Sequence, residues 1–204
     1  MKLKYFGDSY DLVKKSLIAW LSEFGSWVTH PMFTEEFKPE DAGKFSRLLE
    51  TPLLSVEVLT PQTNREEYFS SCQKAGHLFL DPDTGVRLER CRGKKSRKFV
   101  FGPELVEWCD HRPKALTLIF DQSYSREFKK EILLQNKLKY FADNNIFGVA
   151  YDSHATFLLL GADPDLVKAA REKLLEVSGL PPHRLVCLDS KGEPKNGVIA
   201  LSIR

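Results

Sequence analysis

The sequence predicts one α/β domain with a mostly parallel sheet, helices on both faces and an antiparallel hairpin near the C-terminus. Strand-length apolar segments alternate with amphipathic helical segments along most of the chain, a pattern typical of parallel sheets. The expected strands at 148–151 and 155–160 are joined by too few residues for a parallel crossover, so they should be antiparallel. A length of 204 residues suits a single domain that covers residues 1–204.

Apolar periodicity and capping residues predict the individual elements. Asp163 is a good helix cap and Pro164 suits the first turn, so a helix should begin there. The expected helices cover residues 10–24, 40–49, 66–74, 103–111, 126–142 and 163–177. The expected strands cover residues 27–29, 53–59, 77–80, 115–120, 148–151, 155–160, 184–188 and 198–203. Residues 86–101 are expected to form a hairpin that turns at Gly93-Lys94. This order of elements predicts a Rossmann-like fold.

Composition limits the function classes. The formal net charge is only +2, so any binding of nucleic acid must rest on a local basic patch. Apolar runs such as 116–120 are far shorter than the roughly 18–20 residues of a membrane helix. The N-terminal segment soon reaches Asp8 and Asp11 and lacks the apolar core of a signal peptide. The four cysteines form no C-x-x-C pair, which favours reduced thiols over a zinc site. We therefore expect a cytoplasmic protein with no membrane partner; the oligomeric state stays open.

Acidic residues directly follow the predicted strands. Asp81 and Asp83 come after the strand at 77–80, and Asp121 comes after the strand at 115–120. Ligands of open α/β sheets bind outside the carboxyl ends of the strands, so these three residues are the candidate catalytic residues. They are also candidate ligands for Mg²⁺, which binds carboxylates together with water and phosphate oxygens. Aspartate is a common turn and capping residue too, so a structural role stays open for each of them.

Three further residues lie beside the same predicted edge. Asp8 precedes the first helix, His30 directly follows a predicted strand, and Gly85 gives the loop after Asp83 its flexibility. We expect these three residues to contact a cofactor. Asp152, which follows another predicted strand, is more simply explained as a turn residue.

The sequence also predicts how two of the carboxylates are placed. A helix lies between the strands that precede Asp81 and Asp121, as in a right-handed parallel crossover. The two residues should then lie at one edge of the sheet, on adjacent or next-adjacent strands. Because neighbouring strands are about 5 Å apart, we expect their carboxylates within roughly 5–12 Å of each other.

A basic segment follows the acidic loop. Glu89 is the only acidic residue among seven positive charges. These are Arg87, Arg90, Arg92, Lys94, Lys95, Arg97 and Lys98. Clusters of this kind bind phosphate backbones through counterion release, although a solvated turn would have the same composition. Nucleic acid is therefore the expected partner of this segment.

The order of elements resembles a methyltransferase fold. In that fold an Asp/Asn-Pro-Pro-aromatic loop follows the fourth strand; here Leu78–Leu80 is followed by Asp81-Pro82-Asp83. The N-terminal Tyr5–Lys14 segment resembles that of the bacterial ribosomal RNA adenine N6-methyltransferase family, and the chain is also similar to the three-cysteine-motif partner family. The resemblance implies S-adenosylmethionine as cofactor and nucleic acid as substrate.

The sequence departs from that pattern at two motifs. The glycine-rich loop that should follow the first strand is replaced by Val28–Thr34, which contains no glycine. Asp83-Thr84 stands where the pattern has Pro-aromatic. The loop at 81–85 also resembles the Asp-x-Asp loop of haloacid-dehalogenase-type phosphatases, although it lies mid-chain here.

Three functional hypotheses follow. The first is a methyltransferase-like enzyme that acts on nucleic acid and has a divergent cofactor site. The second is a metal-dependent nuclease or phosphoesterase in which Asp81, Asp83 and Asp121 hold Mg²⁺ or Mn²⁺. The third is a non-catalytic module that binds a nucleotide or a partner protein, because a fold does not by itself determine function.

Overall fold

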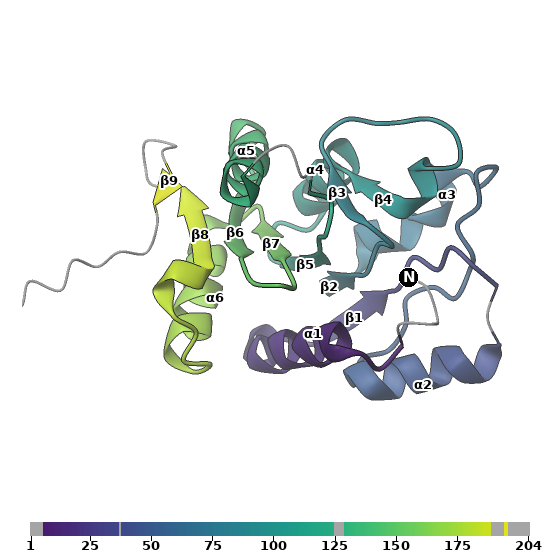
Figure 1. Ribbon diagram of the computed structural model, residues 1–204, viewed down its shortest axis with the longest axis horizontal. Coiled ribbons are helices and arrows are strands. Elements are labelled where there is room, and N and C mark those ends of the chain that lie inside the picture. Colours follow the sequence, from purple (N-terminus) through teal and green to yellow (C-terminus); the bar gives the residue numbers. More distant parts are fainter. Residues whose placement is uncertain (1–5, 37, 125–128, 189–193, 196–204) are drawn as a thin grey trace, which may run out of the picture.

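A mixed β-sheet forms the centre of the molecule in the computed structural model, which describes residues 6–36, 38–124, 129–188 and 194–195 (Figure 1). Among these residues the sheet has seven strands. Their spatial order is β1 (Trp27–His30), β2 (His77–Leu80), β5 (Thr117–Phe120), β7 (Phe157–Gly161), β6 (Phe147–Tyr151), β8 (Leu185–Leu188) and β9 (Pro194–Lys195).

The expectation of a mostly parallel sheet is wrong. Strands β1, β2 and β5 are parallel, but all further pairs, from β5–β7 to β8–β9, are antiparallel. The reason is the tight β6–β7 hairpin, which the short connection correctly predicted. Strand β7 lies between β5 and β6 and runs opposite to both, so the sheet changes from parallel to antiparallel at this point.

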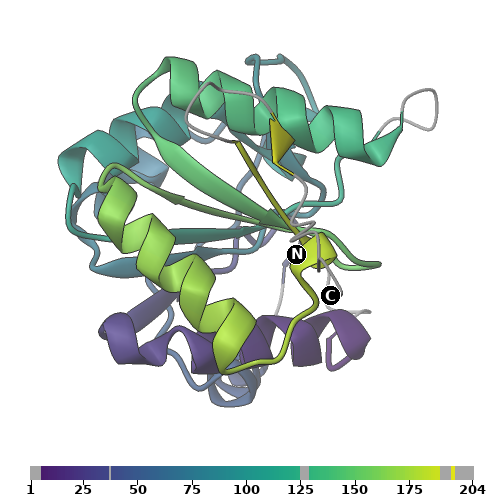
Figure 2. The ribbon, with the colours of Figure 1, turned by 90° about the vertical axis from the view of Figure 1, so that its left-hand side faces the viewer.

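Helices cover both faces of the sheet, as expected, because buried strand side chains alternate between the two sides (Figure 2). Leu78 and Leu80 of β2 belong to one apolar cluster, whereas Phe79 belongs to the other. The first cluster includes residues of α3 (Arg65–Tyr68), η3 (Ser70–Lys74), α4 (Gly102–His111) and α5 (Lys130–Asp143). The second includes residues of α1 (Ser9–Trp20), α2 (Pro39–Leu49) and α6 (Pro164–Glu176).

Several element boundaries follow from the local sequence. Asp163 caps α6 by accepting from the N–H groups of Asp165 and Leu166, as predicted. The helix expected at 10–24 ends at Trp20 and continues, after Leu21, as a short 3-10 turn, η2 (Ser22–Phe24). The helix expected at 66–74 is likewise divided into α3 and η3. The strand expected at 198–203 and the beginning of the helix expected at 126–142 lie outside the described residues.

Two local expectations are wrong. Residues 53–59 form no strand, since only Leu53 makes a β-bridge, to Thr29. Residues 86–101 form no hairpin: β3 (Gly85–Arg87) and β4 (Phe99–Phe101) are parallel and form a separate two-stranded sheet. Parallel pairing requires the chain to return to its starting end, so the residues between these strands form a wide loop that contains η4 (Ser96–Lys98). None of the helices within the described residues is long and apolar enough to cross a membrane.

Candidate functional site

The carboxyl ends of β2 and β5 bring Asp81 and Asp121 to one edge of the sheet, as the sequence predicted. The two strands are parallel neighbours, with Leu80 opposite Ile119. Each aspartate directly follows its strand. Asp81 and Asp121 therefore lie at the same edge of the sheet, as expected. The surroundings of each carboxylate indicate what it can do there.

Asp81 is part of a buried ionic triad. Lys14 of α1 donates from Nζ to Asp81 Oδ2 at 2.9 Å and to Asp11 Oδ1 at 2.8 Å, and all three side chains are at least 95% buried. Burial raises the pKa of the Asp81 carboxyl, although the charge of Lys14 opposes this shift. Burial lowers the pKa of Lys14, but Asp81 and Asp11 together outweigh burial, so its pKa is raised. The triad fastens α1 to the end of β2.

Asp121 is the centre of a second buried network. Its Oδ1 accepts from the N–H of Val86 at 3.0 Å, and from the N–H and Oγ of Ser123 at 3.1 and 2.6 Å. Its Oδ2 accepts from Nζ of Lys137 on α5. The side chain of Asp121 is completely buried, so its lone pairs are directed at protein donors and not at solvent. This arrangement suits a structural carboxylate that joins β5, β3 and α5.

Only glycine fits at position 85, beside Asp121, without a steric clash. Its φ of +136° lies in a region that L-residues rarely adopt. A Cβ at this position would lie 2.1 Å from Oδ1 of Asp121. Gly85 therefore allows β3 to approach Asp121 closely enough for the Val86 hydrogen bond, which explains its presence without a cofactor.

The other two residues expected to contact a cofactor are also held by the protein. Asp8 caps α1, where its Oδ1 accepts from the N–H groups of Tyr10 and Asp11. His30 is fully buried between Tyr68 and Phe69, with ring centroids 5.0 and 5.2 Å away. Burial lowers the pKa of His30 to about 4, so the ring is neutral at physiological pH.

The side chains of the loop after β1 occupy the space beside the loop. Residues 31–34 are buried, with Met32 in one apolar cluster and Phe33 in the other. Met32 has a φ of +47°, a left-handed conformation that is unusual for a residue with this side chain. His30 Nε2 and Thr34 Oγ1 are buried without a hydrogen bond. The residues present do not fit an adenosyl group at this place, because two large side chains occupy the loop where glycines would be needed.

The remaining acidic candidates also have basic partners. The side chain of Asp83 is 9% exposed, and its Oδ2 lies 3.7 Å from Nζ of Lys98. Asp152 pairs with Lys130 at 2.5 Å. Within the described ranges, no group of three or more His, Cys, Asp or Glu side chains is arranged to hold a metal ion. Each of the three aspartates expected to bind Mg²⁺ lies beside a lysine.

The basic segment 87–98 divides into a fixed part and an exposed part. Arg97 donates from Nη1 to the carbonyl of Thr34 at 2.9 Å, and Lys98 faces Asp83. The other five basic side chains are exposed, and among the described residues none of them forms an ion pair. These five are Arg87, Arg90, Arg92, Lys94 and Lys95; we call them the exposed basic loop.

Arg65 of α3 holds the end of this loop. Its guanidinium forms a bidentate ion pair with Glu104 of α4, with N–O distances of 2.7 and 2.8 Å. The same group donates to the carbonyls of Ser96 and Phe99, at 3.2 and 2.9 Å, and lies 4.5 Å from the ring centroid of Phe101. Bidentate arginine–carboxylate pairs are geometrically specific, so the Arg65–Glu104 pair fixes where the loop returns to β4.

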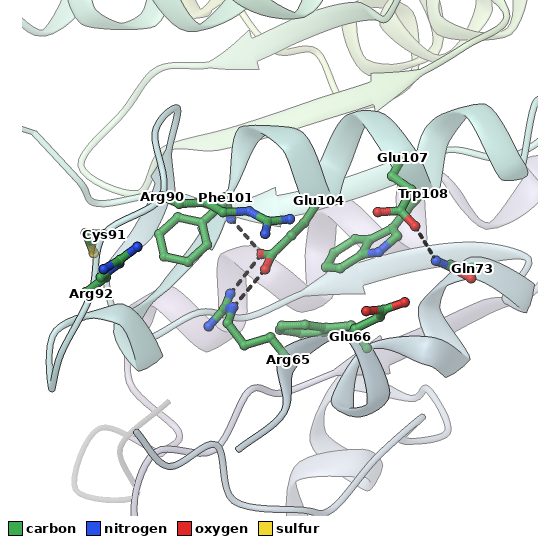
Figure 3. A pocket seen from close by; sticks show the side chains of 11 residues that line it. Arg65, Glu66, Gln73, Arg90, Cys91, Arg92, Phe101, Glu104, Glu107 and Trp108 are labelled. Carbon is green, nitrogen blue, oxygen red and sulfur yellow. Dashed lines mark hydrogen bonds and ion pairs between the residues drawn. The ribbon is translucent and has the colours of Figure 1, made fainter. Parts of the chain in front are cut away.

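A cavity of about 650 Å³ opens between the loop and helices α3, η3 and α4 (Figure 3). It is lined by Arg65, Glu66, Phe69, Gln73, Arg90, Cys91, Arg92, Phe101, Glu104, Glu107 and Trp108. In the close-up view, Arg90 and Arg92 lie on one side and Glu66, Gln73 and Glu107 on the other. The volume is within the range of small-molecule sites, roughly 300–1,000 Å³.

Sequence reasoning missed the two buried lysines and the Arg65–Glu104 pair. Lys14 and Lys137 lie on the apolar stripes of their helices, beside Leu17 and Leu138, where a charged residue is unexpected. That position was the available signal for a buried ion pair. Arg65 and Glu104 are 39 residues apart, and no local pattern connects them.

Comparison with known proteins gave no significant match to a family model, a curated protein or a solved structure.

Proposed function

We propose that this protein binds nucleic acid through the exposed basic loop, and that the aspartates at the sheet edge maintain the fold and do not catalyse a reaction. The proposal rests mainly on which charged side chains are paired within the protein and which are not. The five arginines and lysines of the loop are exposed and have no acidic partner among the described residues, whereas Asp81 and Asp121 are buried against lysines. Groups of exposed lysine and arginine side chains bind phosphate backbones, because binding releases the counterions of the nucleic acid.

The anchoring of the loop supports this proposal. Arg65 holds the backbone at Ser96 and Phe99, and Arg97 holds it against Thr34. A loop fixed at this end loses less conformational entropy when it binds a charged strand than a loop without anchors. The anchors take part in the fold, so the exposed cations are available for phosphate contacts.

The two enzymatic hypotheses have less support. Methyl transfer is favoured by the order of elements, since the antiparallel β6–β7 hairpin follows β5 and α5. The loop after β1, however, does not fit the cofactor. Metal-dependent cleavage would need the lysine-paired carboxylates to bind a cation. Calorimetry with S-adenosylmethionine and cleavage assays with Mg²⁺ or Mn²⁺ should give no signal if the proposed function is correct.

The main test is the salt dependence of binding. Replacing Arg90, Arg92, Lys94 and Lys95 with Ala should weaken binding of a fluorescent oligonucleotide in anisotropy titrations. The slope of log affinity against log salt should become shallower by about 0.7–0.9 for each phosphate contact that is lost.

A matched control removes the same charge from the other face of the molecule. Lys38, Lys44, Arg47 and Lys168 are exposed residues in or beside α2 and α6. Their quadruple alanine variant should keep the wild-type slope. An unchanged slope in the loop variant, or an equal decrease in the two variants, would contradict the proposed function.

A further inference from the structure

The cavity beside the exposed basic loop has two walls of opposite charge. Arg90 and Arg92 form one wall, and Glu66 of α3 and Glu107 of α4 contribute to the other (Figure 3). Arg65 and Glu104 at the base neutralise each other. A ligand in this cavity therefore meets cations on one side and carboxylates on the other.

These walls fit a ligand with an anionic end and a hydrogen-bond-donating end. Phosphate suits the arginine wall, because the planar guanidinium can donate two parallel hydrogen bonds to its oxygens. Carboxylates only accept hydrogen bonds, so the opposite wall requires a donor such as an exocyclic amino group. A nucleotide with an amino-substituted base carries both groups. The cavity volume of about 650 Å³ is large enough for one such unit.

The shape of the cavity is set by the protein. Phe101 and Trp108 are almost completely buried, so their rings form rigid walls and are not surfaces for stacking. Arg65 donates to Glu104, Ser96 and Phe99, so it shapes the base and leaves phosphate binding to the other two arginines. Gln73 donates to Glu107 at 2.7 Å and orients that carboxylate. The site is thus largely formed before a ligand arrives.

We infer that this cavity receives one nucleotide of a bound strand, with its phosphate on Arg90 and Arg92 and the amino group of its base on Glu66 and Glu107. This inference rests on the proposed function and adds a preference for cytosine, adenine or guanine over uracil. Uracil presents a carbonyl oxygen where cytosine presents an amino group, and that oxygen would face the carboxylates. The two pyrimidine nucleotides are therefore a matched pair of probes.

The experiment compares binding of cytidine and uridine 5′-monophosphate by two independent readouts. Trp108 lines the cavity, whereas Trp20 and Trp27 pack in the cluster on the other face, so fluorescence quenching by a nucleotide should disappear in Trp108→Phe. Cys91 also lines the cavity and is partly exposed, so a bound nucleotide should slow its alkylation. Cys187, partly exposed on β8, is the internal control for alkylation and should react at an unchanged rate.

We expect cytidine monophosphate to bind at least about tenfold more tightly than uridine monophosphate, the preference that one hydrogen bond to a charged acceptor supplies. The double variant Glu66→Gln/Glu107→Gln should remove this preference. Glu67→Gln changes an exposed neighbour that does not line the cavity, and it should keep the preference. Replacing Arg90 and Arg92 with Ala should weaken the binding of both nucleotides by the same factor.

The outcomes separate this inference from the proposed function. If neither nucleotide protects Cys91 while oligonucleotides still bind through the loop, the inference is wrong and the proposed function stands. A cytidine preference that persists in the double glutamine variant would also overturn the inference. If the loop variant leaves the salt slope unchanged but cytidine monophosphate still protects Cys91, the proposed function is wrong and the cavity remains a mononucleotide site.

Discussion

Two groups of charged side chains in this molecule differ in whether the protein itself neutralises them. At the sheet edge, Asp81 and Asp121 are buried and each is bound to a lysine from a helix. On the loop between β3 and β4, five basic side chains are exposed and have no ion-pair partner among the described residues. The first group is paired within the protein, whereas the second is the group to which we assign the binding of an external anion.

The position of a carboxylate at the end of a strand therefore does not by itself show whether its charge is available to a ligand. Both aspartates lie where ligands of open α/β sheets bind, at the ends of neighbouring parallel strands. Both are nevertheless paired with buried lysines, and this pairing is the basis of the structural role that we propose for them. Breaking a buried pair leaves an uncompensated charge, so the two regions should respond very differently to substitution.

The largest effect is expected from Lys137→Met. The substitution removes the ammonium group and leaves the fully buried Asp121 carboxylate without its cation. We expect the free energy of unfolding to fall by about 3–5 kcal/mol. Urea denaturation measures this loss. Lys139→Met, on the exposed face of the same helix, is the control and should change stability by no more than about 0.5 kcal/mol. Similar stabilities for the two variants would mean that Asp121 is solvated and available for chemistry.

Lys14→Met should produce a comparable loss at neutral pH, and this loss should depend on pH. The folded pKa of Lys14 is raised above its ordinary value of 10.5. The stability that Lys14 contributes is therefore fully present below pH 10.5 and is lost as the pH rises through the folded pKa. The difference in unfolding free energy between wild type and variant should narrow above pH 10.5. A difference that is constant up to pH 12 would show that Asp81 and Asp11 do not raise the pKa of Lys14.

Gly85→Ala should have a smaller effect that links the two regions, because β3 carries the start of the basic segment. The positive φ alone should cost about 1–3 kcal/mol, and the new Cβ would also clash with Asp121. Thermal or urea unfolding measures the loss. Gly93 has a φ of +80° but nothing within 4 Å of an added Cβ, so Gly93→Ala should cost less. Equal losses would mean that the contact with Asp121 is unimportant.

The smallest stability effect is expected on the exposed basic loop. Replacing Arg90, Arg92, Lys94 and Lys95 with Ala should change the unfolding free energy by no more than about 0.5 kcal/mol per residue, because these side chains are exposed and form no ion pair with any residue that the structure describes. The same variant should lose nucleic-acid affinity, whereas Lys137→Met should keep its affinity under conditions where it is folded. A large loss of stability in the loop variant would remove the distinction between the two regions.

Much of the fold could be predicted from local sequence. The caps at Asp8 and Asp163, the antiparallel hairpin at 147–161 and the parallel placement of β2 and β5 follow from residue types and connection lengths. The direction of the sheet beyond β5 could not be predicted as readily. It depends on where β7 inserts, and that choice involves contacts between residues far apart in the chain.

The candidate site also has features that could be predicted from local sequence and features that could not. The charged residues that follow the strands and the concentration of positive charge can be read from the sequence, because charge, turn chemistry and apolar periodicity are local properties. The pairing of Lys14 and Lys137 with the aspartates, and the position of Arg65 and Glu104 at the base of a cavity beside the loop, depend on the three-dimensional fold. The physical reason is that burial and pairing depend on which helix packs over which strand, and these contacts span from 16 to 67 residues of sequence.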